Sequence, residues 1–211
     1  GIFTDEEEDR GFGAVAALYT ETCQVVVRAD SDIRSIEDLH GKTVSIGAEE
    51  SGSEQNALQS LAAYGRNDKR VSMVNLNYED AAAQLKAGRV DAIFMTVGAP
   101  SPVLTALAGE CGIRLLNVDG AAAQRLQSAY SAYSSVTLPA GTYPGQTEKV
   151  QTVGVKAVLL ASNALPAKQV RQLTQLLFSS REGLEEQLGI PLDPEENAVE
   201  GVGIPFHAGA A

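Results

Sequence analysis

Short apolar segments rich in β-branched residues alternate with amphipathic segments along most of this 211-residue chain. The apolar segments predict strands at 22–28, 43–47, 71–76, 90–95, 113–118 and 150–161. The amphipathic segments predict helices at 35–39, 51–64, 80–87, 100–108, 121–130, 166–177 and 182–188. Residues 134–146, with two prolines and two glycines, predict turns. Strands that alternate with helices are typical of mainly parallel sheets covered by helices, so the sequence predicts an α/β fold.

Composition narrows the possible partners. The chain has 16 Lys and Arg against 27 Asp and Glu, a net charge of −11, and no basic cluster. An acidic surface repels a phosphate backbone, so we expect no nucleic-acid binding. No apolar run approaches the roughly 20 residues that span a bilayer, so we expect no transmembrane segment. Residues 1–10 do not show the basic and apolar regions of a signal peptide, which says nothing of the compartment.

The residues that usually carry catalysis or metal binding are few. Cys23 and Cys111 lack metal-site spacing, and we expect two separate, partly buried thiols rather than a bridge. His40 and His207 each stand alone, without a nucleophile at a recognisable spacing. No Gly-x-Ser-x-Gly motif is present. We therefore predict no catalytic residue, no metal and no cofactor.

The segment 43–54 is the strongest candidate for a binding site. A predicted strand ends at Gly47, and Ser51 followed by Glu54 forms the pattern of a capping box, which predicts a helix N-terminus. Backbone N–H groups and the hydroxyls of Ser51 and Ser53 would then face one point, where partial positive charge suits a carboxylate. Gly47 and Gly52 would let a ligand approach the backbone. An equally good alternative is that Ser51 only caps its helix.

Two further places are weaker candidates. Thr96 and Gly98 follow the predicted strand 90–95, where ligands of open α/β sheets bind, although such loops are often plain connections. Tyr19 precedes the first predicted strand and either lines a cleft or belongs to ordinary surface. The other tyrosines we interpret as packing residues rather than a stacking platform, because they do not share one element: Tyr130, Tyr133 and Tyr143.

Several stretches of the chain resemble a known family. Residues 38–47 resemble the Asp-Leu-Lys-Gly-Lys-x-Val-x-Val-Gly stretch of periplasmic-binding-protein-like domains. That stretch alone is shared with many binding proteins. Together with 51–57, 85–92, 139–143 and 204–210, it resembles the TAXI family, the solute-binding subunits of tripartite ATP-independent periplasmic (TRAP) transporters. The resemblance adds Asn56, in the second stretch, to the predicted ligand-binding residues.

The resemblance implies a type II periplasmic-binding-protein-like fold with two lobes joined by a hinge. Lobe 2 would be 31–151, and lobe 1 would combine 1–30 with 152–211. Two crossover segments, near 23–28 and 152–160, would form the hinge. The family also has a segment of roughly a hundred residues before the position of Gly1, so that lobe 1 would be incomplete in this chain.

The resemblance also implies a function. The protein would be periplasmic or otherwise extracytoplasmic, would capture a small carboxylate or an amino acid such as glutamate or glutamine, and would deliver it to the membrane permease subunits of a TRAP transporter. Two departures bear on the ligand. His207 begins His-Ala-Gly-Ala where the family usually has His-Pro-Gly-Ala, and Glu49 and Glu50 stand where the family more often has small or neutral residues. These two acids either point outward or favour a ligand that also carries an amino group.

Two other functions are compatible with the same fold. The chain would be the ligand-sensing effector domain of a regulator if a basic helical DNA-binding module preceded Gly1. It would be an enzyme on a binding-protein fold if the full-length protein turned over a candidate ligand. The absence of a recognisable nucleophile with an acid–base partner disfavours the enzyme.

Overall fold

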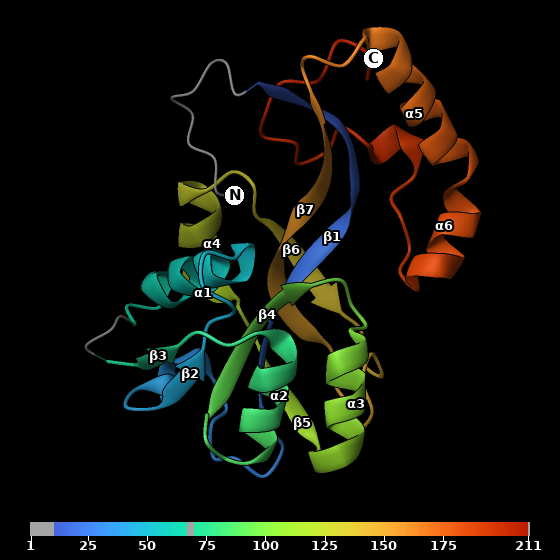
Figure 1. Cartoon of the computed structure of the whole chain (residues 1–211). Helices are drawn as coiled ribbons and strands as arrows, with labels where there is room; N and C mark the ends of the chain where they lie inside the picture. The colour runs from blue at the N-terminus through green and yellow to red at the C-terminus, as the bar shows by residue number, and fades with distance from the viewer. Residues whose placement is uncertain (1–10, 67–69, 211) are drawn as a thin grey trace. The chain divides into compact units, whose positions relative to one another are not determined.

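The computed structural model describes residues 11–66 and 70–210 (Figure 1). The chain forms two compact units. Unit 1 is Thr22–Gly154, and unit 2 joins Val155–Ala211 to the described residues up to Glu21. Two long strands, β1 (Phe12–Arg28) and β7 (Val150–Ser162), have residues in both units.

The remaining elements follow the predicted alternation. The other strands are β2 (Thr43–Ser45), β3 (Ser72–Val74), β4 (Ala92–Val97), β5 (Ile113–Leu116) and β6 (Ser134–Leu138). The α-helices are α1 (Gly52–Ala63), α2 (Tyr78–Lys86), α3 (Pro102–Cys111), α4 (Gly120–Ala129), α5 (Ala167–Ser179) and α6 (Arg181–Leu188). Two 3₁₀ turns lie at Ile36–Leu39 and Glu195–Asn197.

The sheet of unit 1 is mixed. β2 pairs in parallel with β3 and with β4, because the connections between these strands are helices that return the chain to the same edge. β1 runs antiparallel to both β4 and β5, and β6 runs antiparallel to β7. The expectation of a mainly parallel sheet therefore holds only for β2, β3 and β4, the three strands of the βαβ units.

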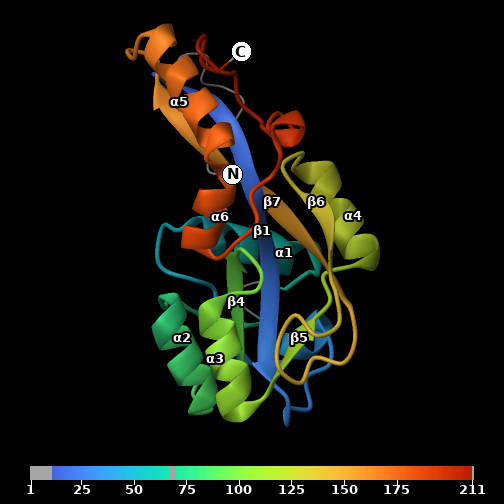
Figure 2. The same cartoon turned by 90° about the vertical axis from the view of Figure 1, so that its right-hand side faces the viewer.

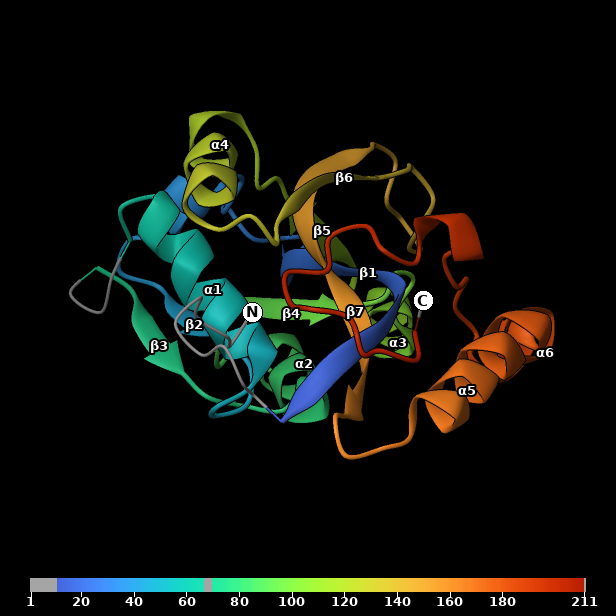
Figure 3. The ribbon, with the colours of Figure 1, turned by 90° about the horizontal axis from the view of Figure 1, so that it is seen from above.

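Helices cover both faces of this sheet (Figures 2 and 3). Ile93 and Met95 of β4 lie in one apolar cluster with Leu85 of α2 and Leu104 of α3. The alternate side chains of β4 face the other way, where α1 packs on the strand and α4 packs on α1. Burial on both faces is why the β4 sequence reads as a continuous apolar run.

In unit 2 the C-terminal segment is held to β1. Ala14 bridges Phe206, and the backbone N–H of His207 donates to the Ala14 carbonyl at 2.8 Å. A Cβ at Gly13 would lie 2.7 Å from the His207 nitrogen, so only glycine permits this approach. α5 buries only Val170 and leaves Leu176 62% exposed.

The structure corrects two further predictions. Residues 134–138 form β6 rather than turns, because they pair with β7 from Ser134 opposite Gly154 to Leu138 opposite Val150. The first strand begins at Phe12 instead of residue 22, because its early part is rich in Ala and Gly, which have low strand propensity.

Cys23 and Cys111 are free thiols, as expected, and Cys23 is buried. No described helix combines the length and the apolar character needed to cross a membrane.

Candidate functional site

Three helices of unit 1 begin at one edge of the sheet. β2 leads into α1, β3 into α2 and β4 into α3. Since these three strands are parallel, their carboxyl ends and the helix N-termini that follow them lie at the same edge. This is the edge at which open α/β sheets bind ligands, and each helix N-terminus brings partial positive charge to it.

The N-terminus of α1 has the predicted cap, with one difference. The Ser51 hydroxyl accepts from the Glu54 backbone N–H at 3.1 Å, as the capping box requires. The Glu54 carboxylate does not complete the box on Ser51 and instead accepts from the Glu50 N–H at 2.7 Å. The two N–H groups between these capping contacts, those of Gly52 and Ser53, have no hydrogen-bond acceptor among the described residues. They are the donors that an anion would engage here.

The loop before α1 is shaped by Gly47. Its φ of 99° lies in a region that side chains disfavour, and a Cβ there would meet the Ser53 Cβ at 2.9 Å. The Gly47 carbonyl accepts from the Leu76 N–H at 3.1 Å and from the Asn75 amide at 3.2 Å, which fixes the loop against the segment after β3. Glu49 and Glu50 are exposed.

Ser53 joins three elements. Its hydroxyl accepts from the Thr96 backbone N–H at 3.2 Å and lies 2.5 Å from the hydroxyl of Tyr78. Tyr78 in turn donates to the Thr96 carbonyl at 2.9 Å. The two predicted candidates Ser53 and Thr96 are therefore in contact, and Tyr78, the first residue of α2, is a member of the site that the sequence analysis missed.

The Thr96 hydroxyl is less constrained than its backbone. Thr96 is 5% exposed, and its Oγ1 has no hydrogen-bond partner by geometry within the described residues. It lies on β4 opposite Cys23 of β1. Burial raises the pKa of Cys23 to about 11, against the smaller lowering effects of the Ser60 and Thr96 hydroxyls. Cys23 is therefore a protonated, unreactive thiol at neutral pH.

A buried polar chain holds the loop after β4. The Ser101 backbone N–H donates to the Tyr143 hydroxyl at 2.9 Å, and that hydroxyl donates to the Gln24 side chain. Gln24 donates in turn to the Val97 carbonyl at 3.2 Å. Gly98, a predicted site residue, lies buried between these anchors. A single amide within the apolar stretch 22–28 was the available sequence signal for this chain of contacts.

Two predicted residues, Asn56 and Tyr19, have other surroundings within their own units. Asn56 is buried, and its side chain accepts from the hydroxyl of Tyr133, in the segment between α4 and β6, at 2.7 Å. Burial raises the pKa of Tyr133. Tyr19 lies on β1 in unit 2, half-buried. Among the described residues no group of His, Cys, Asp and Glu is arranged to hold a metal ion.

A comparison with known protein families matches residues 1–211 to the NMT1-like family. The chain belongs to the NMT1-like family. The match shows membership at the level of this family and does not resolve the TAXI branch that the sequence stretches resemble.

Solved structures show the fold that this NMT1-like chain adopts. A putative L-cystine ABC transporter protein from Listeria monocytogenes matches with a TM-score of 0.52 and 17% identity, over 87% of this chain and 65% of that one. The periplasmic aliphatic sulphonate binding protein SsuA from Escherichia coli matches with a TM-score of 0.49 and 19% identity, over 86% of this chain and 56% of that one. The fold is that of type II periplasmic binding proteins.

The chain thus spans 65% of the Listeria protein and 56% of the sulphonate-binding protein. A third match is the GluR0 ligand-binding core from Nostoc punctiforme, solved with L-glutamate, at a TM-score of 0.45 and 18% identity over 88% of this chain and 66% of that one. At these identities the likeness concerns the fold.

Proposed function

We propose that this chain is the ligand-capturing part of an extracytoplasmic solute-binding protein, and that its ligand is a small carboxylate or an amino acid. The observation that carries the proposal is the pair of N–H groups of Gly52 and Ser53. They have no acceptor among the described residues and lie at the edge where three helices begin. A carboxylate placed there accepts two backbone hydrogen bonds and is attracted by the partial positive charge at the N-terminus of α1.

The second part of the proposal concerns transport. We infer a TRAP-type transporter as the destination of the ligand, with its permease subunits as partners, from the resemblance of the ordered stretches to the TAXI family. Membership of the NMT1-like family and the type II binding-protein fold support solute binding in general. The TRAP assignment depends on the stretches alone, and Asn56, Thr96, Gly98 and Tyr19 remain proposed contacts.

The third part concerns the lobes. We propose that 31–151 is one lobe, that 1–30 and 152–211 belong to the other, and that the hinge lies near 23–28 and 152–160. The proposal is supported by the two strands that both units share, since the units divide at Thr22 in β1 and at Val155 in β7. Ligand binding would then favour the closed arrangement by its differential affinity for it.

Two substitutions at Ser51 test the carboxylate seat without removing the helix cap. Aspartate and asparagine both cap helices well, so Ser51→Asp and Ser51→Asn should each keep the chain folded. Only aspartate places a negative charge beside the Gly52 and Ser53 N–H groups. That charge takes the place of the ligand carboxylate or repels it.

The measurement is thermal unfolding against a panel of amino acids, keto acids and dicarboxylates. A ligand at 100 times its dissociation constant stabilises the folded state by about 2.7 kcal/mol. We expect at least one acidic or neutral carboxylate of the panel to stabilise the unsubstituted protein and Ser51→Asn, and none of these to stabilise Ser51→Asp. If Ser51→Asp responds like the unsubstituted protein, the carboxylate does not sit at the α1 N-terminus.

A further inference from the structure

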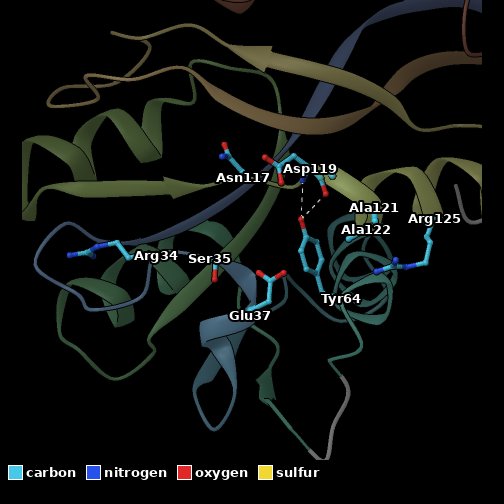
Figure 4. Close-up of a pocket in the computed structure, with 10 residues that line it drawn as sticks. Arg34, Ser35, Glu37, Tyr64, Asn117, Asp119, Ala121, Ala122 and Arg125 are labelled. Atoms are coloured by element: carbon cyan, nitrogen blue, oxygen red, sulfur yellow. Dashed lines mark hydrogen bonds between the residues drawn. The ribbon is translucent and has the colours of Figure 1, made fainter.

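Unit 1 contains a hollow of about 340 Å³ at the far end of α1 from the candidate site (Figure 4). Tyr64, the C-cap of α1, and Asp119, the N-cap of α4, meet in its wall. The hollow shares no lining residue with the loops around Ser51 and Thr96. Its volume falls in the range of about 300–1,000 Å³ that is usual for small-molecule sites.

The wall is held by the backbone of Asp119. The Asp119 N–H donates to the Tyr64 hydroxyl at 2.9 Å, and that hydroxyl lies 3.3 Å from the Asp119 carbonyl, to which it donates. The Asp119 side chain makes no capping hydrogen bond with α4. An aspartate at an N-cap usually accepts a hydrogen bond from the first turn of its helix. The Asp119 carboxylate does not, so it can accept from a ligand.

Three charged groups around the hollow lack a charged partner. In the described part of the chain, Glu37, Asp119 and Arg125 form no ion pair: the salt bridges there join other residues. Arg66 approaches only the backbone carbonyl of Glu37, at 3.0 Å. Arg125 donates from Nε and Nη2 to the Ala63 carbonyl, at 3.2 and 2.7 Å, and its Nη1 has no hydrogen-bond acceptor among the described residues.

These three charges all act on one hydroxyl. Burial raises the pKa of Tyr64, the carboxylates of Asp119 and Glu37 raise it further, and a backbone hydrogen bond and the Arg125 guanidinium lower it. Figure 4 shows the Glu37 and Asp119 carboxylates beside Tyr64, with Arg125 across the ring from Glu37. The hollow thus presents two negative groups and one positive group around an aromatic ring.

Arg34 also lines the hollow but does not change this pattern. Its Nη1 donates to the carbonyls of Ser31 and Ile33, so the guanidinium is held by its own loop. Figure 4 shows its side chain extending away from Tyr64.

We propose that this hollow is a second ligand site, and that it binds a basic amino acid. Such a molecule carries two cationic groups and one carboxylate, the charge complement of Glu37, Asp119 and Arg125. The cationic groups would pair with the two carboxylates beside the face of Tyr64, and the ligand carboxylate would accept from Arg125 Nη1. The net charge of −11 favours the approach of such a ligand. The proposal is independent of the carboxylate seat at α1.

Calorimetric titration with four probes tests the site. L-Arginine and L-lysine should bind, L-glutamate should not bind here, and agmatine, which lacks the carboxylate, should bind without help from Arg125. The double variant Glu37→Gln/Asp119→Asn should weaken L-arginine binding by at least about tenfold, since each substitution removes a charge-assisted hydrogen bond. Arg125→Gln should weaken the binding of L-arginine but not of agmatine.

Matched controls separate this site from the other. Glu148→Gln removes an exposed carboxylate elsewhere in unit 1 and should leave L-arginine binding unchanged. Ser51→Asp should also leave it unchanged, and its loss in that variant would assign the ligand to the α1 seat and overturn the second site.

A measurement on the unsubstituted protein does not depend on how the variants fold. Added L-arginine should shift the backbone amide NMR signals of Tyr64, Asp119 and Gly120, which surround the hollow. Shifts confined to residues elsewhere would overturn the proposal. The absence of binding of any cationic probe at millimolar concentration would also overturn it.

Discussion

The hydroxyl groups of Ser53 and Tyr78 lie 2.5 Å apart and tie the first turn of α1 to the first residue of α2. Tyr78 also donates to the Thr96 carbonyl at 2.9 Å, so one phenol links two helices and the end of β4. Tyr78→Phe should lower the free energy of unfolding by about 1 kcal/mol, the usual net contribution of one intramolecular hydrogen bond to stability. The midpoint and slope of urea unfolding, followed by circular dichroism, give the change.

Tyr130→Phe is the matched control for this substitution. Tyr130 is 43% exposed, and its ring lies edge-on to that of Tyr133, so the change should stay within about 0.5 kcal/mol. Equal effects of the two phenylalanine substitutions would show that the Tyr78 hydroxyl contributes nothing to the fold.

Gly47 and Ser53 are the second pair on which the site depends. Gly47→Ala places a methyl group 2.9 Å from the Ser53 Cβ at a φ of 99°. We expect a loss of about 2–4 kcal/mol, because backbone strain of about 1–3 kcal/mol and a steric clash add together. Thermal and urea unfolding measure the loss.

Gly65→Ala separates strain from clash. Gly65 also has a positive φ, of 66°, but nothing lies within 4 Å of an added Cβ. Gly65→Ala should lower the free energy of unfolding by only about 1–2 kcal/mol, the cost of a left-handed conformation for a residue with a Cβ. If Gly47→Ala lowers the free energy of unfolding no more than Gly65→Ala, the expected clash with the Ser53 side chain does not occur.

Local sequence signals predicted the first half of the candidate site. A serine three residues before a glutamate indicates a helix N-terminus, and Ser51 caps α1 as that pattern requires. The partners of Ser53 could not be predicted in the same way, because Tyr78 and Thr96 lie 25 and 43 residues away and meet it only through the register of β2 and β4. Gln24 stands out as an amide in an apolar stretch, but its partner Tyr143 lies 119 residues away and could not be predicted from that signal.

The same distinction applies to the fold. The helices and strands from 43 to 129 follow their periodicity closely, because each βαβ connection is local. β6 was missed because its five residues acquire strand geometry from pairing with β7, not from their own propensity. The antiparallel course of β1 against β4 is likewise a tertiary property that alternation of elements does not reveal.

Cys23 gives the chain a pH dependence in the alkaline range. Burial raises the pKa of this thiol from 9.0 to about 11, so the folded state holds its proton more tightly than the unfolded state. Stability from this group is full below pH 9 and is lost as the pH rises from 9 through 11. Urea unfolding at pH values across this window should show falling stability.

Substituting each cysteine in turn shows which thiol causes this fall in stability with pH. Cys23→Ala should flatten the fall, whereas Cys111→Ala should flatten it less, because Cys111 is only partly buried. A thiol reagent at pH 8 should label Cys111 faster than Cys23, since thiolate and access are both needed. Rapid labelling of Cys23 in the folded protein would contradict its burial.

Lys156 and Asp193 form the most buried ion pair among the described residues, with Nζ 2.5 Å from Oδ2 and side-chain exposures of 15% and 22%. The Asp193 N–H also donates to the Leu18 carbonyl at 2.6 Å, so the pair anchors the C-terminal segment to β1 and β7 within unit 2. Asp193→Asn should destabilise unit 2 by about 2 kcal/mol, between the roughly 0–1 kcal/mol of an exposed pair and the 3–5 kcal/mol of a fully buried one. Hydrogen exchange at the Asp193 amide reports the opening of this unit directly.

The pair Lys86–Glu110 is the exposed counterpart, with side chains 51% and 54% exposed at 3.0 Å. Glu110→Gln should change stability by less than about 1 kcal/mol. The double variant Lys156→Met/Asp193→Leu should regain part of the loss of Asp193→Asn, because it removes both buried charges instead of leaving the lysine unpaired. If Asp193→Asn leaves the exchange rate of its own amide unchanged, the C-terminal segment is held by its backbone contacts alone.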